Sequence, residues 1–336
     1  MIFPYEYITT IKANALMKIR NKKRKCFVSG CKMNAIQSHV IWKNGILSKI
    51  ADRSNHLIEL NVQKIFRGEK LEFTSTGINS ILAFKGFCNQ HDHDIFKPIE
   101  RSNIDFFNIK NQILISVRGL FFELRKKEMN IEWFEEIIKE EIMPHEEQVN
   151  FMKSQIYFQQ LGMDDISFFI NQINRELDMA TGKYYFKTFQ LPIVPIVSSS
   201  MFAVDGIESI NRTLFSEDFS HSEPLNSFLF SFFPYEGKSY LILGFHTNYL
   251  QNMEIMNKLS SYNESQLFQV ISDILIGKVE SWTCSPTFYE TYIKEDEQNI
   301  FKLFLEYDLD FTGGKMFEFN LFSRWLASNS KLEKGD

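Results

Sequence analysis

The spacing of hydrophobic and polar positions divides the chain into three parts. Between residues 101 and 180, apolar residues recur every three or four positions, as in IKNQILISVRGLFFELRKKE and IEWFEEIIKEEI. This spacing is typical of amphipathic helices. It predicts helices over about 104–141 and 146–180, with a stop at Pro144 and a break near Gly162.

After Thr181 the apolar residues come in short runs separated by proline and glycine, as in YYFKTFQLPIVPIVSSSMFAV and LNSFLFSFFPYEGKSYLILGFHTN. Short β-rich runs of this kind predict antiparallel strands. The second stretch predicts a hairpin that turns around residues 235–238. Further helices are expected at about 250–279 and 289–306, which makes this part an α+β domain.

The first hundred residues keep neither pattern for long. A short helix is expected to start near residue 10 and to end in the basic run NKKRK, after which glycines separate short apolar pieces. This indicates a small module with little core of its own. We therefore expect an α+β protein with a small N-terminal module over residues 1–100, a helical segment over 101–180, and an α+β C-terminal domain with antiparallel strands over 181–336.

Composition limits the class and the compartment. With 336 residues and 44% hydrophobic side chains, the chain is long enough for two domains with sizeable cores. No run approaches the roughly 18 apolar residues of a membrane span. The stretch MIFPYEYITTIKAN lacks the basic start and long apolar run of a signal peptide. We expect a cytoplasmic protein that does not cross a membrane.

Charge is distributed unevenly along the chain. Residues 1–100 contain 16 Lys and Arg against 8 Asp and Glu, a net charge of +8. The whole chain carries −5, so the remaining residues carry −13. A basic N-terminal part suits DNA or RNA, and an acidic C-terminal part suits a protein partner or a second copy of the chain. The alternative is that both are ordinary solvated surfaces.

Three of the four cysteines lie in the first hundred residues. Cys26 and Cys31 fall in KRKCFVSGC, and Cys88 and His91 fall in GFCNQHD. Zinc in proteins takes four sulfur or nitrogen ligands, usually as two close pairs. Reduced thiols in the cytoplasm favour metal binding over disulfides. These four residues are therefore predicted to bind a structural Zn²⁺ that staples the N-terminal module.

A histidine lies between the two pairs, in IQSHVIW. A cysteine pair, then a histidine followed by two apolar residues, then a second metal pair followed by polar residues and Phe together resemble the zinc-containing HNH nucleases. Ser38-His39-Val40-Ile41 matches their first strand, and Phe87-Cys88-Asn89-Gln90-His91-Asp92 matches the entry to their helix. The resemblance covers about residues 24–98 and implies a ββα-metal, treble-clef-like fold there.

The resemblance also implies roles for single residues. His39 would be the general base that activates water to attack a phosphodiester. A catalytic Mg²⁺ or Mn²⁺ would lie at the positions of Ser38 and Asp92. Because a serine hydroxyl is a poor ligand for such an ion, His93 or Asp94 is an alternative to Ser38.

Two further features of the sequence bear on the expected catalytic site. The asparagine that gives the HNH family its middle letter has three candidates here, Asn55, Asn61 and Asn79. Arg118 is a lone charge in the apolar stretch SVRGLFFEL. It is expected to pair with Glu123 or another neighbour, and phosphate binding is the alternative.

The sequence therefore predicts a bacterial HNH-like endonuclease that hydrolyses nucleic-acid phosphodiesters with a divalent metal, of the kind found among phage-defence or mobile-element effectors. The alternative is a catalytically inactive zinc-binding module that binds nucleic acid or a partner protein. A third reading keeps the zinc purely structural and assigns ligand sensing to residues 190–336.

Overall fold

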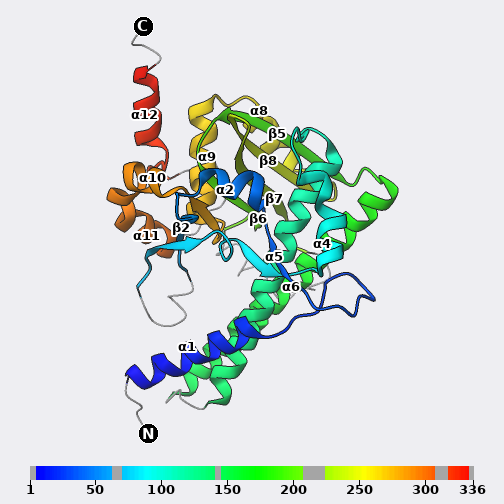
Figure 1. Cartoon of the computed structure of the whole chain (residues 1–336), viewed down its shortest axis with the longest axis vertical. Coiled ribbons are helices and arrows are strands. Elements are labelled where there is room, and N and C mark those ends of the chain that lie inside the picture. The colour runs from blue at the N-terminus through cyan, green and yellow to red at the C-terminus, as the bar shows by residue number, and fades with distance from the viewer. Residues whose placement is uncertain (1–4, 63–69, 141–144, 207–223, 307–316, 333–336) are drawn as a thin grey trace.

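The computed structural model describes residues 5–62, 70–140, 145–206, 224–306 and 317–332 (Figure 1). Helices and antiparallel sheets alternate through these segments, so the expected α+β class is confirmed. In the described part of the chain, no helix has both the length and the apolar content needed to cross a membrane.

One seven-stranded sheet organises the molecule, and all its neighbouring strands are antiparallel. In spatial order its strands are β3 (Phe73–Gly77), β2 (His56–Leu60), β9 (Trp282–Cys284), β6 (Ile196–Ala203), β7 (Ser227–Tyr235), β8 (Lys238–His246) and β5 (Tyr184–Pro192).

The hairpin expected around residues 235–238 is confirmed as β7–β8. Its two turn residues, Glu236 and Gly237, both have positive φ, 45° and 82°. Two consecutive positive φ angles give the turn a twist that matches the twist of the strands, and glycine adopts such an angle without steric cost. Every residue of β7 is buried, because helices cover both faces of the sheet there.

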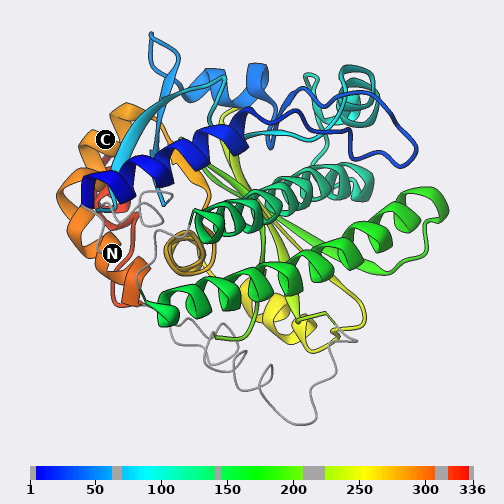
Figure 2. The ribbon, with the colours of Figure 1, turned by 90° about the horizontal axis from the view of Figure 1, so that it is seen from below.

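The first face of the sheet is covered by α5 (Ile109–Lys139), and α6 (Glu146–Met179) packs beside α5 (Figure 2). The expected break near Gly162 is wrong, since α6 is one continuous helix. A Cβ atom at Gly162 would lie 2.8 Å from Cε of Lys127. The glycine therefore allows α6 to approach α5 closely. The expected stop at Pro144 lies outside the described residues.

Close packing also fixes α5 on the sheet. A Cβ atom at Gly119 would lie 2.8 Å from Oγ of Ser199. The hydroxyl groups of Ser199 and Ser231 are 2.7 Å apart across β6 and β7, so both buried groups are satisfied. Small side chains at this point let the helix backbone approach the strands.

The second face is covered by α9 (Glu264–Gly277), with α8 (Asn252–Ser260) just before it. Asn263 and Gln266 exchange hydrogen bonds in a capping box, which explains why the helical pattern over 250–279 divides here. Phe228, Phe230 and Phe232 of β7 pack in the same apolar cluster as α9, whereas Leu229 and Phe233 belong to the cluster on the α5 side. The alternation follows from the two-residue period of a strand.

The segment after β9 is built from short helical turns. They are α10 (Pro286–Phe288), two turns over Tyr289–Ile293 and Lys294–Asp296, α11 (Glu297–Glu306) and α12 (Ser323–Leu332).

The N-terminal part begins with α1 (Tyr5–Asn21), which packs against the far end of α5. A two-stranded sheet follows, β1 (Gln37–His39) with β4 (Ala83–Lys85), and then α4 (Asn89–Phe96). Between β1 and β4 the chain makes the turns Lys43–Leu47 and Ser48–Ile50 and the β2–β3 hairpin.

The β2–β3 hairpin leaves this small sheet and joins the large one. Ile58 of β2 pairs with Cys284 of β9, and Oγ1 of Thr283 donates a 2.8 Å hydrogen bond to the carbonyl of Ile58. The large sheet therefore combines strands from residues 1–100 with strands from residues 181–336.

Candidate metal centre

The first metal-ligating pair lies in a tight hairpin before β1. The amide of Cys26 donates to the carbonyl of Met33 at 3.1 Å, and the amide of Cys31 donates to the carbonyl of Val28 at 3.0 Å. Gly30, with φ +75°, makes the turn between the two cysteines. Both thiols consequently face the same side of the hairpin.

The second pair lies where α4 begins. Cys88 is the residue before the first turn, and His91 is one turn further along. Two backbone hydrogen bonds join this segment to the cysteine hairpin: the amide of Phe27 donates to Gly86 at 2.9 Å, and the amide of Ile36 donates to Phe87 at 2.7 Å. These backbone hydrogen bonds bring together two pairs of candidate metal ligands that are far apart in sequence.

The four side chains predicted as metal ligands do meet. Their ligand atoms all lie within 4.8 Å of one another. The sulfur of Cys26 is 3.4 Å from Nδ1 of His91, that of Cys88 is 3.3 Å from the same nitrogen, and those of Cys31 and Cys88 are 3.9 Å apart. One ion can therefore touch all four residues.

Burial and the start of α4 shift the pKa values of two of the thiols in opposite directions. Burial raises the pKa of Cys26, whose side chain lies in the core. The backbone N–H of His91, in the first turn of α4, lowers the pKa of Cys88. Only the thiolate is a strong metal ligand, so the lowered pKa favours that form of Cys88 and the raised pKa disfavours that form of Cys26.

His39, expected as a general base, lies at the end of β1, opposite Ala83 of β4. Its Nε2 is 2.8 Å from the carbonyl oxygen of Ile78. A carbonyl only accepts, so Nε2 carries the proton and Nδ1 is the basic nitrogen of the neutral ring. Burial is the main reason why the pKa of His39 is lowered. The charges of Lys43 and Arg118 lower the pKa further.

Asp92, expected as a ligand of a catalytic ion, already has a charged partner. Both of its oxygens are 3.4 Å from a terminal nitrogen of Arg118, and the other terminal nitrogen of Arg118 is 2.5 Å from Glu100. The guanidinium also lies 4.2 Å from the centre of the Phe96 ring. Arg118 is 1% exposed. It therefore joins α5 to α4 and to the turn that follows.

The residues next to Arg118 in the sequence gave no sign that its side chain would lie beside Asp92. The expected partner, Glu123, instead pairs with Lys126 at 3.1 Å. The signal that could have revealed this contact was an arginine within an apolar run. When such a run is buried, as it is in α5, the charge requires a carboxylate from another element. The pairing with Glu100 and Asp92 supplies two.

The remaining predicted residues have different environments. Ser38 is 1% exposed, and its hydroxyl makes no hydrogen bond within the described residues. His93 and Asp94 are exposed on α4, directly after the residue that contacts Arg118. Neither belongs to the group of four side chains that could hold a metal ion.

The three asparagine candidates separate clearly. Asn79 follows Ile78, whose carbonyl holds His39, and its side-chain oxygen accepts from Nζ of Lys43 at 3.2 Å. Asn55 has a positive φ of 60° in the turn before β2. Asn61 lines a cleft to which neither His39 nor the four candidate metal ligands contribute. Asn79 is therefore the candidate nearest in the chain to the contact that orients His39.

Comparison of the chain with protein-family models, with curated proteins and with solved structures finds no match.

Proposed function

We propose that this protein is a zinc-containing, HNH-like nuclease that hydrolyses nucleic-acid phosphodiesters. The observation that carries the proposal is the order β1, β4, α4, with four metal-ligating side chains at its base and His39 on β1. The interactions that set the pKa of His39 include the charge of Asp92 on α4. Asp92 has the smallest of these influences, so the base and the carboxylate lie within electrostatic range of each other.

Zinc is the ion that this donor set suits best. With Zn–S bonds of about 2.3 Å and Zn–N bonds of about 2.0 Å, the edges of a tetrahedral site are roughly 3.5–3.8 Å. The separations of 3.3, 3.4 and 3.9 Å between ligand atoms are close to these edges. Three thiolates and one imidazole also favour zinc over Mg²⁺ or Ca²⁺, which prefer oxygen.

His39 supplies the proton chemistry in this proposal. Nδ1 would accept the proton of the attacking water while the carbonyl of Ile78 holds the ring by Nε2. Because the pKa of His39 is lowered, its ring stays neutral, and hence able to act as a base, at pH values where an ordinary histidine is already protonated.

A catalytic Mg²⁺ or Mn²⁺ fits the residues present only in part. Such an ion would supply Lewis-acid stabilisation of the phosphate. Asp92 offers it one carboxylate, but Arg118 already neutralises that group, and the hydroxyl of Ser38 is buried. No step is therefore assigned to a second ion.

The same two observations favour a second candidate function. A carboxylate occupied by Arg118 and a buried serine in place of a strong ligand are the features expected of a zinc module that binds nucleic acid or a protein without cleaving it. The positive charge of residues 1–100 is compatible with both candidates.

Both candidates suit a reducing compartment such as the bacterial cytoplasm, because three thiols must stay reduced to bind the ion. For the nuclease, a role in phage defence or in a mobile element is part of the proposal.

Cleavage assays separate the two candidates. Purified wild type is incubated with plasmid DNA and with RNA, each with Mg²⁺, Mn²⁺ or EDTA. The nuclease predicts cleavage that falls at least about a hundredfold in His39→Ala, the usual contribution of a general base. The matched control is His145→Ala, an exposed histidine before α6, which should cleave like the wild type. Equal cleavage by His39→Ala would refute His39 as the base, and no cleavage by the wild type would leave the binding module.

A further inference from the structure

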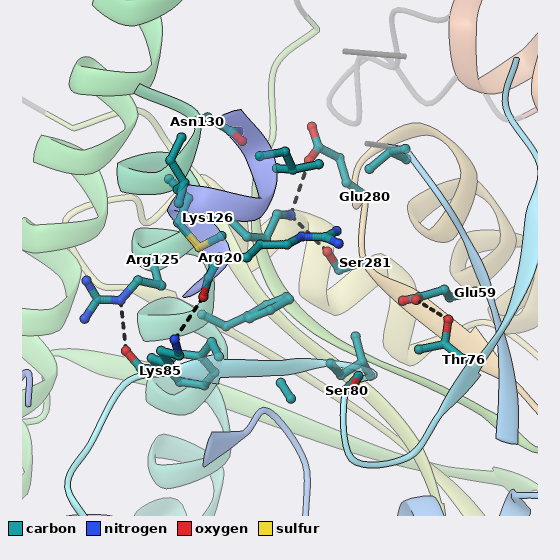
Figure 3. A pocket seen from close by; sticks show the side chains of 18 of the residues that line it. Arg20, Glu59, Thr76, Ser80, Lys85, Arg125, Lys126, Asn130, Glu280 and Ser281 are labelled. Atoms are coloured by element: carbon teal, nitrogen blue, oxygen red, sulfur yellow. Dashed lines mark hydrogen bonds and ion pairs between the residues drawn. The ribbon is translucent and has the colours of Figure 1, made fainter. Parts of the chain in front are cut away.

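A cleft of about 570 Å³ lies between α1, α5, β4 and the part of the large sheet formed by β2 and β9 (Figure 3). Neither the metal ligands nor His39 line it. Its volume falls in the range of about 300–1,000 Å³ that is usual for small-molecule sites. The cleft is therefore large enough for a ligand of its own.

One side of the cleft is cationic. Arg20 is exposed at the end of α1, and Figure 3 shows its side chain pointing into the cleft. Nζ of Lys85 donates to the carbonyls of Arg20 and Lys22 at 2.9 and 3.0 Å, which keeps this ammonium group at the rim. Nζ of Lys126 is 3.2 Å from Glu280, 3.1 Å from Glu123 and 2.9 Å from Oγ of Ser281, so two carboxylates already pair with this cation. The three cations come from three different elements.

The opposite side offers an acceptor. Glu59 of β2 accepts a 2.7 Å hydrogen bond from Oγ1 of Thr76 on β3. Burial raises the pKa of Glu59, and the charge of Arg20 opposes this shift. The carboxylate has more acceptor capacity than one hydroxyl uses, so it can also accept from a ligand.

Apolar and aromatic side chains form the floor between these two sides. Phe84, Phe122, Trp133 and Trp282 all line the cleft and are between 2% and 9% exposed. Little of each ring is exposed, so together they offer a ligand an apolar surface rather than an open stacking face.

We propose that the cleft binds a mononucleotide, with its phosphate toward Arg20 and Lys85 and its hydroxyl or amino donors toward Glu59. A mononucleotide combines an anionic group, hydrogen-bond donors and a planar ring in a molecule of this size, and the cleft presents a counterpart for each. The inference does not depend on the nuclease proposal, because the cleft is lined by other residues.

The cleft is connected to the site around His39 through β4. β4 lines the cleft and pairs with β1, and within this ladder Ala83 lies opposite His39. A ligand held by Lys85 is expected to slow amide exchange in β4, which gives a readout that does not require catalysis.

The test is isothermal titration calorimetry of the full chain with AMP, GMP, CMP and UMP, with the corresponding nucleosides, and with inorganic phosphate. At least one mononucleotide should bind with a dissociation constant below about 1 mM, at least tenfold more tightly than its nucleoside or phosphate. Arg20→Gln should weaken this binding about tenfold, the effect of losing one charge-assisted hydrogen bond. Hydrogen exchange of β4 should slow in the same complex.

The matched control is Lys23→Gln. Lys23 is exposed just after α1 and does not line the cleft, so its loss should leave the affinity unchanged. Absence of binding by all four mononucleotides at millimolar concentration would overturn the proposal. So would equal weakening in both variants, or phosphate binding as tightly as the best nucleotide, because the ring and the donors would then contribute nothing.

Discussion

At the scale of single residues, the most consequential contact is the one between Arg118, Asp92 and Glu100. An arginine that is 1% exposed contacts two carboxylates, and one of them, Asp92, is the residue that the resemblance assigns to a catalytic ion. Paired charges of this kind are costly to break one at a time, because the charge left behind stays desolvated. Arg118 therefore ties α4 to α5 and also determines whether Asp92 is available to a metal.

Replacing Arg118 by methionine should lower the free energy of unfolding by about 3 kcal/mol, near the lower end for a broken buried pair. The value is not higher because the side chains of Asp92 and Glu100 are 17% and 25% exposed, so water screens part of the repulsion. Urea unfolding measures this change.

The control for Arg118→Met is Arg324→Met. Arg324 pairs with Glu295 but is 38% exposed, and its loss should cost less than about 1 kcal/mol. Equal losses in the two variants would show that the contact with Asp92 and Glu100 carries no special energy.

His246 gives the expected dependence of stability on pH. It is 3% exposed at the end of β8, its Nδ1 accepts from the amide of Asn248, and its Nε2 has no hydrogen-bond partner among the described residues. Burial lowers the pKa of His246. The unfolded chain therefore binds this proton more readily, so the contribution to stability is complete above a pH of about 6.5 and is lost as the pH falls below that value.

His246→Phe should flatten the acid side of a plot of melting temperature against pH between about 7.5 and 5. Phenylalanine keeps the ring that packs on Tyr184 and Phe168 and removes the titrating nitrogen. An acid slope as steep as that of the wild type would assign the pH dependence to other groups.

At the scale of elements, the sequence was most informative where a period continued for many residues. The helical spacing predicted α5 and α6, and the turn residues Glu236 and Gly237 predicted the β7–β8 hairpin. The spacing could not show that Gly162 lies within a helix, because its reason is contact with Lys127 on another element. Local rules therefore identified the elements and failed at their contacts.

The metal ligands were predictable for a related reason. Closely spaced pairs of cysteine and histidine indicate metal binding whatever the length of chain between the pairs, and the four residues do come together. Arg118 and Glu100 are only 18 residues apart, closer than Cys31 and Cys88, but they share no motif. Only the packing of α5 against the turn Lys97–Ile99, which follows α4, brings them together.

The basic run after α1 also has a different use from the one its composition favours. Lys22 and Arg24 pair with Glu132 of α5 at 2.8 and 2.6 Å, and Lys18 pairs with Glu136. Part of the positive charge of residues 1–100 therefore holds α1 on α5. The charge left for a polyanion is smaller than the sequence count of +8.

At the scale of the whole molecule, the β2–β3 hairpin connects the unit that carries the four candidate metal ligands to the large sheet. β2 supplies the neighbour of β9, and Phe73 of β3 packs on Trp282 with ring centres 5.5 Å apart. Without this hairpin, β9 would become an unpaired edge and the ring of Trp282 would be uncovered.

A fragment of residues 101–336 should accordingly be less stable than the full chain and prone to aggregate. Thermal unfolding and light scattering of the two proteins measure both effects. A fragment that remains monomeric and melts within a few degrees of the full chain would show that the large sheet does not need the hairpin.

The central claim is that Cys26, Cys31, Cys88 and His91 hold one zinc ion that fixes α4 beside β1. The most direct measurement is the metal content per chain of the purified protein by elemental mass spectrometry, for wild type, Cys88→Ser and His93→Ala. We expect one zinc per chain in the wild type and in His93→Ala, since His93 is exposed outside the cluster, and none in Cys88→Ser. A wild type without metal, or a Cys88→Ser protein that keeps its zinc, would contradict the claim.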